Sequence, residues 1–247
     1  MILIKNEAEL EKLRASGRVA AQVRDRVAAQ VRPGVRAADL SDYAAELMKE
    51  YGAESAFLGY RGYPAPICVS VNETVVHGIP NDRGIELGDI VSIDIGVRLD
   101  GFVGDTAVTV MVGVTDPRVI NLVRTAETAL EAGIAHATEG HRVSDISHAI
   151  EEAVVAGGCS VVREFVGHGI GRSMHEDPQI PNYGAPGKGS RLRAGMTFCL
   201  EPMVNLGGHG VAIADDGWTV RTRDGLPSAH FEHMVAVGRK RAEVLTL

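Results

Sequence analysis

Residues 91–110 contain two segments rich in β-branched residues, Ser92-Ile93-Asp94-Ile95-Gly96 and Asp105-Thr106-Ala107-Val108-Thr109-Val110. Both segments predict β-strands, and Leu99-Asp100-Gly101 between them predicts a tight turn. If the loop is even in length and no bulge intervenes, Asp94 and Asp105 project from the same face, directly opposite or one diagonal apart. Two carboxylates facing each other among apolar neighbours repel one another, so such a pair needs a cation. The alternative is a pair of solvent-facing acids near a turn.

The composition restricts the class of protein. A chain of 247 residues, 45% of them hydrophobic, suits one large domain or two small ones with an ample core. The net charge of −7, the pI of about 5.7 and the lack of a basic run argue against a nucleic-acid partner. The apolar run at the N-terminus is too short for a signal peptide, and no segment approaches the roughly 20 apolar residues that span a bilayer. Three widely spaced cysteines argue against a disulfide framework. We therefore expect a cytoplasmic protein without a membrane partner.

Apolar spacing and helix-breaking residues outline an α+β chain. Helices are predicted at residues 7–30, 38–51, 116–138 and 144–156. Strands are predicted near Val161 and at residues 67–71, 196–204, 218–221 and 230–237, whereas residues 72–88 are expected to be mostly loop.

The two halves of the chain share a pattern. A shift of 106 positions aligns identical residues at six pairs of positions, namely Gly34 and Gly140, Arg36 and Arg142, Asp39 and Asp145, Ser41 and Ser147, Glu46 and Glu152, Gly52 and Gly158. At a shift of 107, Asp94 falls on Glu201. We therefore predict one domain formed by an internal duplication, with halves at roughly residues 1–112 and 113–247. Their two sheets would meet and direct their acidic residues into a shared cleft.

Three further positions after the central hairpin carry acid or imidazole groups. His168 lies among the glycines of Val166-Gly167-His168-Gly169-Ile170-Gly171, which let the backbone approach a bound group closely. Glu201 and Glu232 are charged residues within apolar segments that read as strands. Taken one at a time, the histidine reads as a loop residue and each glutamate as a strand residue that points to water. Taken with Asp94 and Asp105, they make one imidazole and four carboxylates.

This set carries too many negative charges for one cation. Oxygen ligands with one imidazole suit divalent Mn, Co, Fe or Zn better than a thiolate site would. Two such ions, roughly 3.5–4 Å apart and bridged by carboxylates and a water, would neutralise the cluster. A water between two cations loses its proton readily and becomes a nucleophile, so the set predicts a hydrolase.

Seven ordered motifs make the chain resemble the type I methionine aminopeptidases, which have the pita-bread metallopeptidase fold. The motifs are Val76-His77-Gly78-Ile79-Pro80, Ser92-Ile93-Asp94-Ile95-Gly96, Gly104-Asp105-Thr106, Gly167-His168-Gly169-Ile170-Gly171, His175-Glu176-Asp177-Pro178, Glu201-Pro202-Met203 and Phe231-Glu232-His233. The resemblance runs through nearly the whole chain. It implies two pseudo-symmetric halves with antiparallel sheets covered by helices, and removal of N-terminal methionine when the second residue is small.

The resemblance also implies a role for each candidate residue. Asp94 would chelate one metal, His168 and Glu201 would hold the other, and Asp105 and Glu232 would bridge both. Glu201 would double as the general base, and His175 and His77 would contact the scissile amide and stabilise developing charge. The pocket for the methionine side chain would be apolar and closed at its end, with candidate lining residues Tyr60, Tyr63, Cys68, Met174, Met203 and Trp218. Phe57 stands where many bacterial members carry a cysteine, and Met174 where many carry a phenylalanine.

Partners and rival functions follow from the same comparison. The implied partners are N-termini of nascent polypeptides, with transient ribosome association and a monomeric enzyme. No zinc-binding extension precedes the first helix, so ribosome docking by that route is not expected. No insertion of about sixty residues separates His175 from Glu201, which argues against the type II branch. The rivals are a proline-specific aminopeptidase or prolidase of the same fold, and an inactive peptide-binding module on that fold.

Overall fold

The computed structural model describes residues 2–247, and its four long helices agree with the predicted ones to within two residues at each end. Asn6 begins the first helix with a capping box, in which its side chain accepts from Glu9 N and the Glu9 carboxylate accepts from Asn6 N. Asp116 caps the third helix, and Pro117 occupies its first turn. The helices are α1 (Glu7–Ala28), α2 (Ala37–Glu50), α3 (Pro117–His136), α4 (Val143–Ala156) and the short 3₁₀ helix η1 (Tyr60–Gly62).

The strands form four small antiparallel sheets. One sheet has the order β1-β4-β2, with β5 paired to β4; the others have the orders β13-β10-β6, β11-β12-β3 and β15-β14-β9-β7-β8. The strands are β1 (Glu54–Ser55), β2 (Cys68–Val71), β3 (Thr74–Val76), β4 (Ile90–Leu99), β5 (Phe102–Met111), β6 (Ser160–Val161), β7 (Gly167–Gly169), β8 (Glu176–Ile180), β9 (Thr197–Leu200), β10 (Met203–Asn205), β11 (Val211–Ile213), β12 (Val220–Thr222), β13 (Ser228–His230), β14 (His233–Ala236) and β15 (Glu243–Val244).

The central hairpin of β4 and β5 is regular over ten residue pairs, from Ile90 opposite Met111 to Leu99 opposite Phe102. Its two-residue turn is Asp100-Gly101, and both residues have positive φ, 49° and 79°. Positive φ at both central positions is the requirement of a type I′ turn, whose twist matches that of the strands it joins. The predicted turn and the even loop length are therefore confirmed.

Several predicted segments differ from the structure for local reasons. Residues 72–88 contain β3, which pairs with the distant β12, and His168 lies in strand β7 rather than in a loop. The predicted strand at residues 196–204 is broken at Glu201-Pro202, because proline has no N–H for a ladder bond. The predicted strand at residues 230–237 is broken at Phe231-Glu232. Both breaks coincide with a candidate glutamate.

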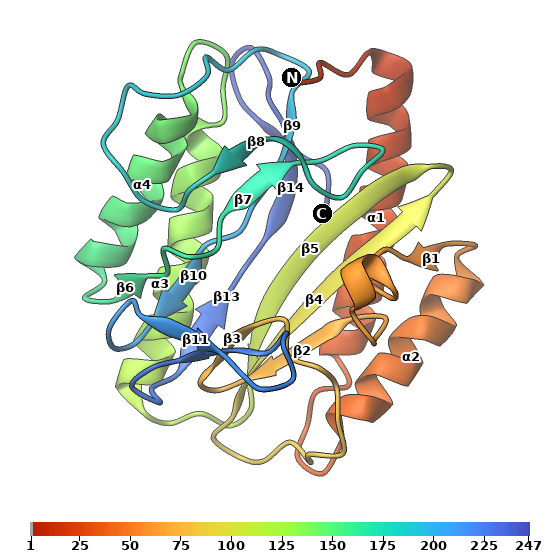
Figure 1. Cartoon of the computed structure of the whole chain (residues 1–247), viewed down its shortest axis with the longest axis vertical. Coiled ribbons are helices and arrows are strands. Elements are labelled where there is room, and N and C mark those ends of the chain that lie inside the picture. The colour runs from red at the N-terminus through yellow and green to blue at the C-terminus, as the bar shows by residue number, and fades with distance from the viewer. Residues whose placement is uncertain (1) are drawn as a thin grey trace.

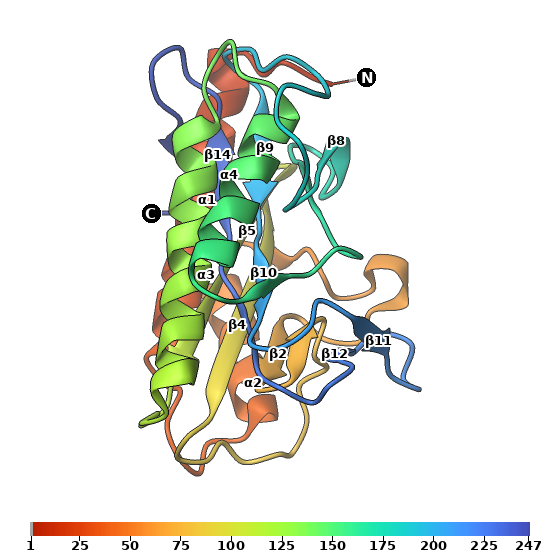
Figure 2. The same cartoon turned by 90° about the vertical axis from the view of Figure 1, so that its left-hand side faces the viewer.

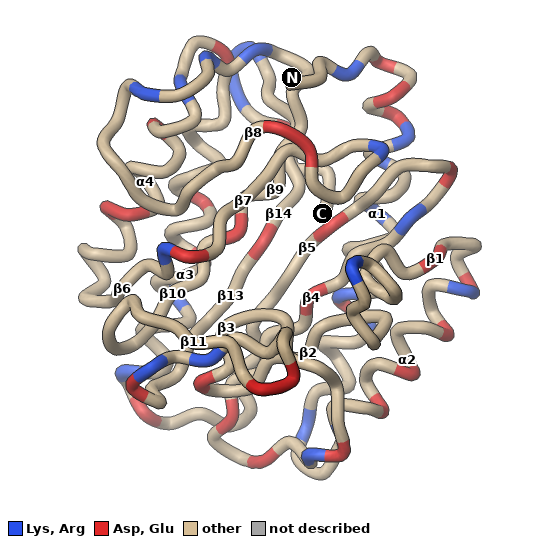
Figure 3. The backbone as a smooth tube through the Cα atoms, viewed as in Figure 1, with Lys and Arg blue, Asp and Glu red and all other residues tan. Residues whose placement is uncertain are grey.

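The helices cover one face of the sheets. Figure 1 shows α1 and α2 beside β4 and β5 at the right of the view, and α3 and α4 at the left. Figure 2 shows the loops around β8, β11 and β12 on the face away from α1 and α3. Each helix pair has its own apolar cluster, one around Leu40 and Ile93 and one around Leu122 and Ile150. Acidic and basic positions are interspersed over the view in Figure 3. Among residues 2–247, no helix is long and apolar enough to cross a bilayer.

The two halves meet at the centre of the molecule. Ala107 N donates to the Glu232 carbonyl at 3.3 Å and Glu232 N donates to the Ala107 carbonyl at 3.0 Å, so β5 and the residues before β14 are bridged. Thr106 Oγ1 also donates to the Glu232 carbonyl, at 2.8 Å. Through these bonds β5 fixes the backbone of Glu232.

Equivalent backbone hydrogen bonds recur in the two halves at the predicted offset. Ala53 N donates to the Met48 carbonyl after α2, and Cys159 N donates to the Val154 carbonyl after α4, 106 positions later in each case. The capping boxes at the starts of α2 and α4 likewise use Asp39 and Asp145. These matches support the duplication with halves at residues 1–112 and 113–247, which stays a prediction until the halves are superposed.

Close packing of α1 on β5 depends on Gly104. A Cβ added there would overlap the backbone carbonyl of Ser16, and backbone cannot move aside as a flexible side chain can. We expect Gly104→Ala to lower the free energy of unfolding by about 2 kcal/mol in urea titrations. The matched control is Gly84→Ala, whose added Cβ meets nothing within 4 Å. Equal stability of the two variants would contradict this account of the helix–strand packing.

Candidate active site

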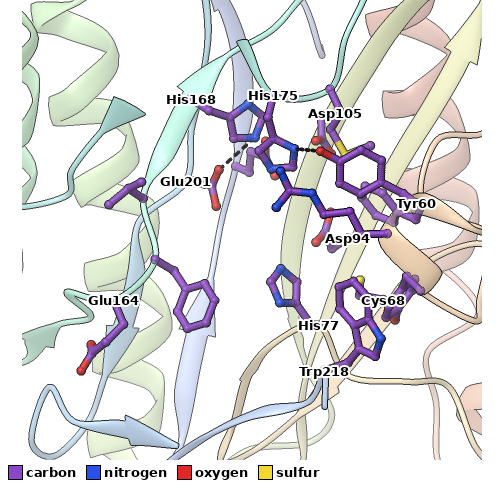
Figure 4. Close-up of a pocket in the computed structure, with 17 residues that line it drawn as sticks. Tyr60, Cys68, His77, Asp94, Asp105, Glu164, His168, His175, Glu201 and Trp218 are labelled. Atoms are coloured by element: carbon purple, nitrogen blue, oxygen red, sulfur yellow. Dashed lines mark hydrogen bonds and ion pairs between the residues drawn. The ribbon is translucent and has the colours of Figure 1, made fainter. Parts of the chain in front are cut away.

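A single pocket on the loop face collects almost all of the candidate residues (Figure 4). Its floor holds the acids and the imidazole, and its wall is aromatic and apolar. Of the sequence-predicted residues, the pocket is lined by Phe57, Tyr60, Tyr63, Cys68, His77, Asp94, Asp105, His168, Met174, His175, Glu201, Trp218 and Glu232.

The central hairpin places the two aspartates as neighbours on one face. Asp94 is opposite Ala107, and Asp105 is opposite Gly96, so the two acids are one diagonal apart, as expected. Asp105 is 4% exposed. On the other side of β4, Cys68 of β2 is paired with Asp94 and lies beside its carboxylate.

The second half supplies three side chains from the strands that face this hairpin. His168 lies at the centre of β7, and Glu201 and Glu232 lie at the two strand breaks. The Glu201 carbonyl accepts a hydrogen bond from Asn182 Nδ2 at 3.1 Å, which holds the backbone at the break. Glu201 Oε1 is 3.3 Å from His168 Nε2. Because Glu201 and Glu232 lie where their strands are interrupted, both side chains can turn into the same pocket.

Four carboxylates in one buried place destabilise their own ionised forms. Burial raises the pKa of Asp94 to about 7. Burial, with repulsion from neighbouring carboxylates, raises the pKa of Asp105, Glu201 and Glu232 well above the usual range. Among residues 2–247, no arginine or lysine forms an ion pair with these four acids, although Arg61 lines the same pocket. The cluster therefore needs cations.

His168 is a neutral imidazole with one ring nitrogen free to bind a cation. Its Nδ1 lies 2.9 Å from the Gly169 carbonyl, which can only accept a hydrogen bond, so Nδ1 carries the proton and Nε2 keeps its lone pair. Burial lowers the pKa of His168 to about 3. The imidazole is therefore neutral at neutral pH, with its one proton on Nδ1, and Nε2 lies toward Glu201.

The donor set fits divalent metal ions. Asp94 Oδ1, Asp105 Oδ1 and Glu232 Oε1 are buried and have no hydrogen-bond partner among residues 2–247, a costly state that metal coordination would relieve. One donor atom each from Asp105, His168, Cys199 and Glu232 lie within 4.8 Å of one another. Cys199 was not among the candidates from sequence, although it stands two positions before Glu201 in the strand predicted at residues 196–204 and would share its face there.

The apolar wall is built around Tyr63. Its hydroxyl donates to the carbonyls of Ile67 and Gly78, at 3.2 and 3.0 Å. Its ring packs edge-on against Phe57 and Trp218, with centroids 6.5 and 5.2 Å apart. The Phe57 ring occupies the space that a side chain at position 96 would fill, so only glycine fits at that position beside the phenylalanine.

Met203 is the exception among the expected pocket residues. It is fully buried in a separate cluster with Val76 and Val162 and does not line the pocket. Strand β10 begins at Met203, after the break at Pro202, and pairs Met203 with His230. The direction of the Met203 side chain therefore does not follow from that of Glu201 by strand alternation. The expectation that Met203 lines the pocket is therefore not met.

Two histidines stand above the floor on opposite sides of the pocket (Figure 4). His77 has φ of 57°, an uncommon backbone state for a non-glycine residue, and its ring lies edge-on to Phe165 at 5.4 Å. Burial lowers the pKa of His77 to about 4. His175 Nδ1 is 2.8 Å from the Tyr60 hydroxyl, and the two rings stack. Burial lowers the pKa of His175 as well.

The pocket also has lining residues that the sequence did not indicate. They are Arg61 in the η1 loop and the run Glu164, Phe165 and Val166 before β7. No periodic pattern marks these loop positions, because the loops reach the pocket only through the packing of distant strands.

Comparisons with known proteins agree with this site. The model of metallopeptidase family M24 matches residues 11–239. A methionine aminopeptidase of Clostridium perfringens is 46% identical over 247 residues, covering 100% of this chain and 99% of its own. The solved structure of methionine aminopeptidase from Thermotoga maritima has a TM-score of 0.98 and 46% identity, covering 100% of this chain and 99% of its own.

The prolidase alternative shares the fold at much greater distance. The prolidase of Pyrococcus furiosus is 22% identical, with a TM-score of 0.80, and the match covers 99% of this chain but 65% of the prolidase chain. That likeness shows a common pita-bread architecture of helices and antiparallel sheets, and no more. From the family model, the relatives at full coverage and the buried acid cluster together, this chain belongs to metallopeptidase family M24.

Proposed function

We propose that this protein removes the N-terminal methionine from peptides whose second residue is small. The observation that carries the proposal is one pocket in which four carboxylates and a neutral imidazole form the floor beside a compartment of aromatic and sulfur-bearing side chains. A metallopeptidase needs such a cluster of carboxylates and imidazole, and the aromatic and sulfur-bearing compartment is well matched to a thioether side chain. The similar proteins at 46% identity carry the name methionine aminopeptidase.

We propose a centre for two divalent ions, which four carboxylate charges would balance. The residues that would hold the two ions are Asp94, Asp105, His168, Glu201 and Glu232. When bound, the ions supply Lewis-acid chemistry that polarises the scissile carbonyl and makes water a nucleophile at neutral pH. Co, Mn, Fe and Zn all accept such ligands.

The protein groups around the centre handle protons and orientation. Glu201 takes the proton of the attacking water and passes it to the departing amine, acting as base and then as acid. The Tyr60 hydroxyl lies 2.8 Å from His175 Nδ1. If the hydroxyl donates in this bond, the proton of His175 lies on Nε2, where it would donate to the scissile carbonyl oxygen. His77, held neutral by burial, contacts the same amide from the other side.

The apolar compartment selects the departing residue. The space in which the methionine side chain would lie is surrounded by six side chains, those of Tyr60, Tyr63, Cys68, Phe57, Met174 and Trp218. Tyr63 and Trp218 fix its shape, because Tyr63 is held by two backbone carbonyls and packs on the indole. Substrates are N-termini of nascent chains in the cytoplasm, met during transient association with the ribosome. One chain supplies the whole pocket, which is compatible with the monomeric enzyme that we propose.

The test is metal-free protein titrated separately with Co, Mn, Fe and Zn, with hydrolysis followed on Met-Ala-Ser and Ala-Pro peptides. We expect no activity without metal, and release of methionine from Met-Ala-Ser once metal is added. Cleavage of Ala-Pro in place of Met-Ala-Ser would favour the prolidase alternative. Metal binding without cleavage of either peptide would favour the inactive peptide-binding module.

A further inference from the structure

A buried thiol, Cys199, lies against the acid cluster and has no assigned role in the chemistry above. Cys199 belongs to β9 and is 0% exposed. It lies opposite His168 of β7 and opposite Met234 of β14, so strands on both sides fix its position. Its sulfur is within 4.8 Å of donor atoms of Asp105, His168 and Glu232.

The thiol lies beside the carboxylate of Glu232. The Cys199 sulfur is within 4.8 Å of a carboxylate oxygen of Glu232, a residue that is 3% exposed, and the two side chains are near enough to interact. Glu232 Oε1 has no hydrogen-bond partner among residues 2–247 and stays available to a cation. In the first half of the chain, Cys68 of β2 is paired with Asp94 of β4. Each half thus places a thiol beside one of its own carboxylates.

Charge balance favours a hydrogen-bond donor over a metal ligand. The four carboxylates bring four negative charges, which two divalent ions neutralise. A thiolate would add a fifth negative charge in a place where all neighbours are buried, and an unbalanced buried charge is costly. As a neutral thiol, Cys199 instead has one proton to donate, and carboxylates that bind metals are themselves oriented by such donors.

We propose that Cys199 is a positioning residue of the metal centre, whose S–H donates to Glu232 and fixes the direction in which that carboxylate meets the ions. The proposal rests on the two-ion centre proposed above and adds a residue to it. It predicts that metal binding depends on a hydrogen-bond donor at position 199 and does not require that the donor atom be sulfur.

The experiment measures Co²⁺ binding to metal-free protein by calorimetry and records the visible and near-ultraviolet spectra of the cobalt forms. Cys199→Ser keeps a donor, Cys199→Ala removes it, and Cys199→Val removes it while filling the space. Cys159→Ala is the matched control, since Cys159 is also buried but hydrogen bonds to the Gly157 carbonyl beyond α4, away from the cluster.

We expect Cys199→Ala and Cys199→Val to weaken Co²⁺ binding by about 10- to 100-fold and to change the visible cobalt spectrum. Cys199→Ser should bind within about threefold of wild type, and Cys159→Ala should be unchanged. Unaltered Co²⁺ affinity in both Cys199→Ala and Cys199→Val would overturn the proposal. So would a sulfur-to-cobalt charge-transfer band in the wild type that Cys199→Ser loses, because it would make the sulfur a ligand. A wild-type protein that neither binds Co²⁺ nor cleaves Met-Ala-Ser would instead overturn the proposed function, and this inference with it.

Discussion

Replacing Glu201 by glutamine should abolish almost all peptide hydrolysis while leaving the fold intact. Glutamine keeps the size of the side chain and a weak oxygen ligand, but it removes the proposed base and one of four negative charges. General-base catalysis alone contributes about 10²- to 10⁴-fold, and the same change would weaken a proposed metal ligand. We therefore expect kcat for Met-Ala-Ser to fall by about a thousandfold or more at saturating metal.

The control for this prediction is Glu164→Gln, which removes a carboxylate from the rim of the same pocket. Glu164 is exposed, and in Figure 4 it lies away from the acid cluster, so this variant should keep near wild-type kcat. Metal content and circular dichroism of both variants separate loss of chemistry from loss of the centre or of the fold. If Glu201→Gln kept more than about a tenth of the wild-type rate, Glu201 would not be the base.

The sequence predicts best what is local. Asp94 and Asp105 belong to one hairpin, and the Asp100-Gly101 turn sets its register, so the diagonal pair could be predicted without knowing the rest of the fold. The helices were predictable for the same reason, because caps and apolar spacing are read within one segment.

What the sequence could not supply is set by contacts between distant segments. Strand β3 pairs with β12 more than a hundred residues later, and nothing local distinguishes it from a loop. The breaks at Pro202 and Glu232 reset the alternation of side chains, which is why the facing of Met203 could not be predicted. Cys199 could have been found, since alternation along the strand predicted at residues 196–204 places it on the same face as Glu201.

The second residue of the substrate should control the rate almost as strongly as the first. In the proposed binding mode, the methionine side chain lies against Tyr63 and Trp218 and the scissile carbonyl beside His175. The next side chain would then lie at the mouth of the pocket near His77. That mouth is crowded, because the rings of Phe165 and Trp218 both lie edge-on to His77, at 5.4 and 6.2 Å. Small side chains fit there, and large ones must displace a ring.

We expect fast removal of methionine before Gly, Ala, Ser, Thr, Cys, Pro or Val, and slow removal before Leu, Lys, Arg or Glu. A bulky second residue should cost about 3–4 kcal/mol in the transition state, a factor of several hundred in kcat/KM. The measurement is a panel of tripeptides varied at the first two positions with one metal at saturation. At the first position, norleucine should replace methionine with modest loss because it matches its length, whereas leucine, branched one carbon too early, should be much slower. Equal kcat/KM for Met-Lys and Met-Ala peptides would show that His77 and Phe165 do not form the barrier, and the second residue would then have to leave the pocket by another side.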